Sequence, residues 1–166
     1  MSDKTPSNSA NAEGIYEPFS IDDVPWESYS HGSRYGSRYK QLAAFGGASH
    51  VGVAMEELAP GMQACPNHYH YLEEEQLFVM EGSLTLRLGD KTYLMSAGSY
   101  VVFPAGQKLG HSLTNHTDAV CRYLVLGERN PHDVIVYPDS NRVTVRLSDE
   151  SYDKAATLTY WEREPE

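Results

Sequence analysis

The most informative part of this chain runs from Gly61 to Gly82 and reads GMQACPNHYHYLEEEQLFVMEG. Within this stretch, His68 and His70 are two positions apart, and Glu75 follows after four further residues. Residues two apart in a β-strand project from the same face, so the two imidazoles can bind one ion. The four residues before Glu75 are enough for a turn that brings the chain back alongside the His-x-His strand.

A second stretch runs from Gly98 to Asn115 and reads GSYVVFPAGQKLGHSLTN. It offers a third imidazole, His111, which is followed by Asn115 four positions later. Pro104 and Gly106 precede His111 and indicate a tight turn before the strand on which it would lie.

Together, the two stretches resemble the two motifs of the cupin superfamily, which follow each other at this interval. The first motif fits from His68 to Gly82, with six residues rather than the usual five between Gly61 and His68. The second fits except that four residues rather than two separate Gly106 from His111. Both departures lie in loops before a ligand strand, so they affect the shape of the loop more than the identity of the ligands.

The resemblance implies a single-domain, all-β cupin fold: a double-stranded β-helix, or jelly-roll β-barrel, with one metal ion inside. It assigns the metal to His68, His70, Glu75 and His111, and makes Asn115 a structural hydrogen-bonding residue. The sequence is also similar to small bacterial cupins that are often labelled mannose-6-phosphate isomerase-like.

Other residues could also be ligands. Glu74 satisfies a three-residue gap after His70, but only Glu75 keeps six residues before Gly82. Cys65 lies three positions before His68 and could supply a thiolate. Three imidazoles and one carboxylate suit one divalent first-row ion per chain and leave positions for water or substrate. These ligand types do not distinguish Fe, Mn, Zn, Ni or Co.

The pattern of short apolar runs cut by Gly and Pro between Phe45 and Tyr137 independently indicates an all-β fold. Gly89-Asp90 suits a hairpin turn, and Pro60-Gly61 suits a type II turn. The clearest predicted strands are Leu84 to Leu88, Thr92 to Met95, Tyr100 to Phe103 and Val120 to Leu126.

The chain has 166 residues and a net charge of −10, which disfavours nucleic-acid and anionic membrane partners. Residues 1–14 are almost free of apolar side chains, so we predict a disordered N-terminal tail. The cupin domain is expected over residues 15–148, with its motifs within 61–115, followed by an acidic tail over 149–166. Cys65 and Cys121 are expected to be free thiols, with one disulfide between them as the alternative. The expected location is cytoplasmic.

The segment HGSRYGSRYK, residues 31–40, contains a short duplication and the most basic part of the chain. It is interpreted as an N-terminal strand or subunit contact rather than as a nucleic-acid patch. Such a strand could cover a barrel edge, and a homodimer is expected because barrels of this type tend to pair through edge strands.

The leading functional hypothesis is a metal-dependent enzyme that acts on a small organic molecule. Dioxygenase chemistry at iron is one form, and isomerase or lyase chemistry at a Lewis-acid metal is the other. The second form needs a general base, for which Glu81, Tyr93, Tyr100 and Tyr123 are candidates. The alternative is a non-catalytic cupin module that binds a small molecule or only the metal.

Overall fold

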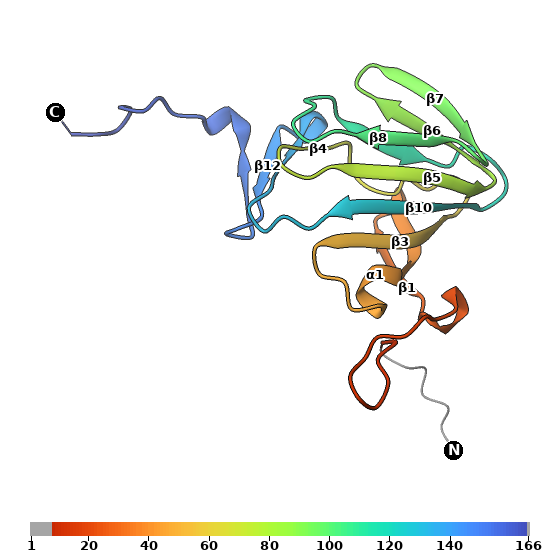
Figure 1. Ribbon diagram of the computed structural model, residues 1–166. Coiled ribbons are helices and arrows are strands. Elements are labelled where there is room, and N and C mark those ends of the chain that lie inside the picture. The colour runs from red at the N-terminus through yellow and green to blue at the C-terminus, as the bar shows by residue number, and fades with distance from the viewer. Residues whose placement is uncertain (1–7, 166) are drawn as a thin grey trace.

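The computed structural model describes residues 8–165, and most elements within this range are β-strands (Figure 1). The strands are β1 (Glu27–His31), β2 (Tyr35–Gln41), β3 (Val51–Leu58), β4 (Tyr69–His70), β5 (Glu75–Glu81), β6 (Ser83–Leu88), β7 (Lys91–Ser96), β8 (Tyr100–Phe103), β9 (His111–Thr114), β10 (Cys121–Glu128), β11 (Val134–Tyr137), β12 (Arg142–Val145) and β13 (Glu150–Asp153). The helical elements are the four-residue α1 (Leu42–Phe45) and the single 3₁₀ turns η1 (Ile21–Asp23), η2 (Pro138–Ser140) and η3 (Lys154–Ala156). The predicted all-β fold is confirmed.

The strands form three antiparallel sheets. The largest has the order β1-β2-β3-β10-β5-β8, the second has the order β7-β6-β9, and the third has the order β13-β12-β11-β4. In Figure 1, β3, β10, β5 and β8 lie side by side, with β6 and β7 along one border. Side chains from the first two sheets and from the loop before β4 meet in one apolar core, whose buried members are Leu58, Ala64, Leu77, Val79, Leu84, Leu86, Met95, Phe103, Leu113, Cys121 and Tyr123.

The predicted strands and turns are found close to their expected positions. The four expected strands correspond to β6, β7, β8 and β10, with ends that differ by no more than two residues. Gly89 adopts φ of 57° in the β6–β7 hairpin, and Gly61 adopts φ of 76° in a turn that Met62 closes by donating to the Ala59 carbonyl at 3.2 Å. Both glycines occupy the left-handed region that a side chain would strain.

Asn115 joins three parts of the barrel. It is fully buried, and its Nδ2 donates to the carbonyls of Leu58 and Ala119, each at 2.8 Å. Its Oδ1 accepts hydrogen bonds from the backbone N–H and the hydroxyl of Thr117. Asn115 therefore connects the end of β9 to the end of β3 and to the loop before β10, which confirms the expected structural role.

The ends of the described chain contact the barrel. Residues 1–7 of the predicted N-terminal tail lie outside the described residues, but the N–H of Ser9 donates to the Phe45 carbonyl at 2.9 Å. At the other end, β13 pairs along its whole length with β12, within the stretch predicted as an acidic tail. Backbone hydrogen bonds are therefore also found outside the predicted cupin domain, before residue 15 and after residue 148.

The basic segment 31–40 contributes to a hairpin, because β1 and β2 pair in register from Glu27↔Tyr39 to His31↔Tyr35. This confirms its interpretation as a strand. β2 pairs in turn with β3, so the hairpin covers an edge of the barrel sheet and leaves β1 as the new edge.

Cys65 and Cys121 are both free. No helix within residues 8–165 is long and apolar enough to cross a membrane.

We predict that Leu84→Ala lowers the free energy of unfolding by about 2–5 kcal/mol, because it leaves a cavity in the core. Leu94→Ala is a matched control on the neighbouring strand, since Leu84 is 0% and Leu94 is 73% exposed. The control should change the unfolding free energy by less than about 0.5 kcal/mol in urea denaturation. Equal losses in the two variants would contradict the assignment of the core.

Candidate metal centre

The four predicted metal ligands come from three strands and one loop. His70 lies in β4, Glu75 is the first residue of β5, and His111 is the first residue of β9. His68 precedes β4 and is paired with His111 through two backbone hydrogen bonds of 3.1 and 2.8 Å. This bridge connects the β4 segment to β9, and so it brings the two sequence motifs together.

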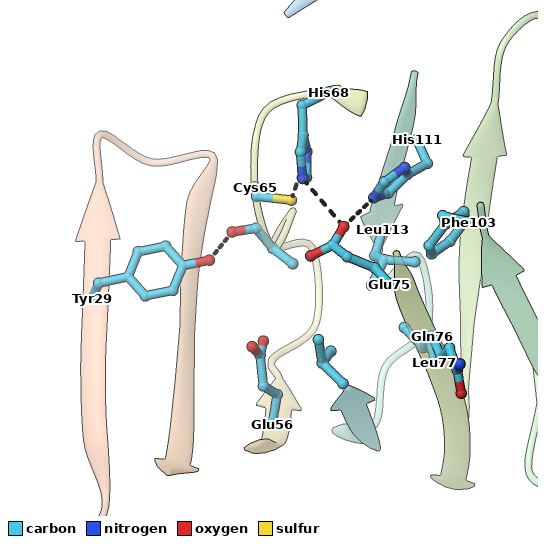
Figure 2. Close-up of a pocket in the computed structure, with 12 residues that line it drawn as sticks. Tyr29, Glu56, Cys65, His68, Glu75, Gln76, Leu77, Phe103, His111 and Leu113 are labelled. Carbon is cyan, nitrogen blue, oxygen red and sulfur yellow. Dashed lines mark hydrogen bonds and ion pairs between the residues drawn. The ribbon is translucent and has the colours of Figure 1, made fainter. Parts of the chain in front are cut away.

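The side chains of the four residues converge on one carboxylate oxygen. Glu75 Oε2 lies 3.0 Å from Nε2 of His111, 3.4 Å from Nε2 of His70 and 3.6 Å from Nε2 of His68. Figure 2 shows His68 and His111 pointing toward Glu75 from two sides. The potential ligand atoms of His68, His70 and Glu75 all lie within 4.8 Å of one another, and Glu75 connects His111 to this group.

The opposite edges of two imidazoles are held by hydrogen bonds. Nδ1 of His70 is 2.6 Å from Oδ2 of Asp133, and Nδ1 of His68 is 2.9 Å from the Pro66 carbonyl. Because both partners are acceptors, the ring proton belongs on Nδ1 and the lone pair on Nε2. In this tautomer both Nε2 atoms point toward the carboxylate of Glu75 and each offers a lone pair to an ion.

A cation placed between the imidazoles and the Glu75 carboxylate fits this arrangement better than direct contacts between these groups do. The Nε2 atom of His70 is buried and has no hydrogen-bond partner among residues 8–165. A buried nitrogen lone pair that faces a carboxylate oxygen is unfavourable unless a proton or metal ion lies between them. The donor set and this unpartnered atom both fit a divalent ion held by His68, His70, Glu75 and His111.

Asp133 lies in the loop before β11 and is the main support of His70. It is fully buried, and its Oδ1 accepts a hydrogen bond from the Leu72 N–H at 2.9 Å. A carboxylate that accepts from the Nδ1–H of a ligand histidine orients the ring and increases its basicity. Glu73 is also buried and reaches Nδ1 of His70 at 3.5 Å, but Arg146 pairs with it at 2.7 Å.

The environment keeps Glu75 ionised. Burial by itself would raise the pKa of Glu75, but the adjacent imidazoles of His111, His68 and His70 hold this pKa well below its usual range. Burial lowers the pKa of His111, and this effect exceeds the opposing influence of Glu75. An ionised carboxylate with a neutral imidazole is the protonation state that metal ligation requires.

Two other residues that the sequence offered as ligands take different positions. The carboxylate of Glu74 accepts a hydrogen bond from Gln76, so it does not belong to the converging group. Sγ of Cys65 lies 3.7 Å from Nδ1 of His68, which is the ring nitrogen on the side opposite the ligand atom. Phe103 stacks on the ring of His111 with a centroid distance of 3.7 Å and fixes its orientation.

A cavity of about 230 Å³ opens beside the converging side chains. It includes His68, Glu75 and His111, whereas His70 lies outside its lining (Figure 2). The remaining lining residues are mainly apolar or aromatic and are Tyr29, Glu56, Ala64, Cys65, Gln76, Leu77, Phe103, Leu113 and Val125. Leu77 and Leu113 are buried and line the cavity, because each lies two positions after a predicted ligand on the same strand face.

Three of the four predicted candidates for a general base face away from this cavity. Glu81 is exposed and pairs with Arg122 at 3.0 Å, while Tyr93 and Tyr100 are exposed on the outer surface. Tyr123 is fully buried, and its hydroxyl donates to Glu56 at 2.9 Å. Glu56 was not among the residues predicted from the sequence, although it stands between Ala54 and Leu58 on the inner face of β3, where strand alternation predicts an apolar residue.

The comparisons with known proteins agree with this architecture. A family model described as "Cupin domain" matches residues 54–127, which include all four predicted ligands. The fold is therefore a cupin jelly roll. No curated protein matches the chain.

Two solved structures resemble this chain over most of its length. One is a putative sugar phosphate isomerase from Acidithiobacillus ferrooxidans, with 28% identity over 75% of this chain and 80% of that chain and a TM-score of 0.72. The other is a sugar phosphate isomerase from Silicibacter pomeroyi, described as a member of a cupin superfamily, with 27% identity, 87% and 98% coverage and a TM-score of 0.75. The polyketide cyclase RemF from Streptomyces resistomycificus shares 24% identity over 68% of this chain and 78% of that chain with a TM-score of 0.56, which shows the fold alone.

We predict that Asp133→Asn weakens metal binding about 10- to 100-fold, because an amide cannot accept from both His70 and Leu72 as the carboxylate does. The measurement is a competitive titration of Zn²⁺ or Mn²⁺ into metal-free protein. Asp118→Asn, on an exposed turn, is the control and should leave the affinity unchanged. Equal affinities in both variants and the wild type would show that Asp133 does not support the centre.

Proposed function

We propose that this chain is a metal-dependent enzyme that acts on a small organic molecule by isomerase or lyase chemistry. The observation that carries the proposal is the convergence of three imidazole Nε2 atoms on Glu75 at the wall of a cavity. A divalent ion bound there would act as a Lewis acid that polarises a carbonyl or hydroxyl oxygen of the substrate.

The residues around the site have separable tasks. His68, His70, Glu75 and His111 would hold the ion, and Asp133 would orient His70. Leu77, Leu113 and Phe103 form apolar walls that exclude water, which strengthens electrostatic interactions inside the cavity. The volume of about 230 Å³ lies below the range of about 300–1,000 Å³ for pockets that bind drug-sized ligands. We therefore infer a small substrate.

Two further observations favour isomerase or lyase chemistry over dioxygenase chemistry. The cavity contains a second carboxyl group, Glu56, which could transfer protons. The similar structure from Silicibacter pomeroyi is described as a sugar phosphate isomerase, and the one from Acidithiobacillus ferrooxidans as a putative sugar phosphate isomerase. Dioxygenase chemistry remains the expectation if the native metal is iron, and a non-catalytic module remains the alternative if ligands bind without conversion. The narrower mannose-6-phosphate isomerase-like label and a cytoplasmic location stay predictions.

Metal analysis of anaerobically purified protein tests the proposal. The wild type should contain about one divalent ion per chain, and His111→Ala should lose most of it because a ligand is removed. His116→Ala is the matched control, since His116 is exposed and its ring contacts Thr85. Metal-free wild-type protein that also fails to take up added Fe, Mn, Zn or Ni would contradict the proposal.

We also propose that the protein is a homodimer. β1 is the exposed edge of the six-stranded sheet, and Tyr29 on this strand is 42% exposed. An unpaired strand edge is a ready template for pairing with a second chain. Sedimentation at low micromolar concentration should give a mass of about twice 18.5 kDa, and a species of 18.5 kDa alone would contradict the dimer.

A further inference from the structure

A second carboxyl group faces the cavity from a strand that provides none of the predicted metal ligands. Glu56 lies in β3, between Ala54 and Leu58, and is the only acidic residue besides Glu75 among the described residues that line the cavity. Figure 2 shows its carboxyl group across the cavity from the side chains that converge on Glu75. A carboxylate in such a position is costly unless it has polar partners.

The partners of Glu56 hold one of its two oxygens. The hydroxyl of Tyr123 donates to Oε2 at 2.9 Å, and the hydroxyl of Ser37 donates to the same atom at 3.2 Å. Among residues 8–165, no hydrogen-bond partner is found for Oε1. The carboxyl group is therefore anchored at one oxygen, and the other oxygen is available to a molecule in the cavity.

The surroundings of Glu56 also favour proton exchange. Burial raises the pKa of Glu56, the nearby Glu75 raises it further, and the hydrogen bonds from Tyr123 and Ser37 partly offset these effects. A carboxyl group whose pKa moves toward neutrality is a better general base and acid than an exposed one.

The charge of the cavity bears on the class of substrate. No Lys or Arg is present among the described residues that line the cavity. Arg122 forms ion pairs with Glu57 and Glu81, and Arg87 forms a bidentate ion pair with Asp139. Neither arginine is therefore free to bind a phosphate. A bound divalent ion would be neutralised by Glu75 and Glu56 together, which favours an uncharged substrate over a phosphorylated one.

We propose that Glu56 is the catalytic proton-transfer residue of this cavity and that the substrate is an uncharged α-hydroxycarbonyl compound. This inference rests on the proposed function, because a carbon-bound proton is acidic enough only when the adjacent carbonyl is polarised. Glu56 Oε1 removes a proton from the hydroxyl-bearing carbon, and the electron pair of that C–H bond forms a carbon–carbon double bond while the carbonyl oxygen takes the negative charge.

The reaction is completed without any added reagent. The hydroxyl proton moves to the former carbonyl oxygen, and protonated Glu56 returns its proton to the neighbouring carbon. The carbonyl and hydroxyl groups thereby exchange positions, the product is an isomer of the substrate, and Glu56 is ionised again. Tyr123 and Ser37 are positioning residues, since they contact Glu56 rather than the reacting carbon.

Hydrogen exchange with solvent tests this proposal. Metal-loaded protein is incubated in D₂O with dihydroxyacetone or glyceraldehyde, and loss of the carbon-bound hydrogen is followed by NMR against a metal-only blank. The wild type should catalyse exchange, and Glu56→Gln should slow it about 100-fold or more, within the usual contribution of a general base. Dihydroxyacetone phosphate should exchange at least about tenfold more slowly than dihydroxyacetone, because the cavity has no cationic side chain for the phosphate.

Glu57→Gln is the matched control. Glu57 is the next residue of β3, but it faces outward, where it pairs with Arg38 and Arg122. This variant should exchange at the wild-type rate, and all the variants should still bind one ion per chain. If Glu56→Gln fails to fold, Glu56→Asp keeps the acid, shortens its reach and should slow exchange about tenfold with full metal content.

The outcomes separate this inference from the proposed metal centre. Exchange by Glu56→Gln at the rate of Glu57→Gln would overturn the role of Glu56, as would loss of the metal from Glu56→Gln. Metal-loaded wild type that exchanges neither uncharged probe would overturn proton transfer by Glu56 but not ion binding. Faster exchange of the phosphate ester would overturn the substrate class. A wild type that binds no metal would instead contradict the proposed function.

Discussion

The contact between three imidazole nitrogens and one oxygen of Glu75 is the interaction on which the rest of the site depends. The three distances lie between 3.0 and 3.6 Å, although the residues come from β4 and its preceding loop, β5 and β9. These elements lie in three different sheets. The site can exist only if the sheets close around a common core, and the His68–His111 backbone bridge is one of the contacts that close them.

The carboxyl groups around the site differ in role because they lie at different positions relative to the cavity. Asp133 lies behind His70, where it fixes the ring and has no access to the cavity. Glu56 lies on the far wall of the cavity, where its anchored oxygen and its available oxygen can serve a substrate. Glu57, one position later, faces the outer surface and pairs with arginines. Neighbouring acidic residues thus differ in function because strand alternation directs them to opposite sides of the sheet.

Much of the fold was predictable because the signals are local. Leu84 and Leu86 alternate with polar residues, and glycines mark the turns at Gly61 and Gly89, so strand and turn positions follow from short windows. The two motifs also predict that His68, His70, Glu75 and His111 approach one another. The side chain of Asp133 was not predictable in this way, because it meets His70 across 63 positions and its own neighbours contain no repeating pattern. Glu56 could have been identified from the sequence, since it is an acidic residue at a position of β3 where strand alternation predicts an apolar side chain.

The location of a bound ion tests the four-ligand metal centre most directly. Crystals grown with Mn²⁺ or Zn²⁺ can be measured at the absorption edge of the metal, so that anomalous scattering gives the position of the ion. One strong peak is expected about 2.0–2.2 Å from Nε2 of His68, His70 and His111 and from a carboxylate oxygen of Glu75. A peak among His70, Glu73 and Asp133 instead, or no peak at either group, would contradict the four-ligand centre.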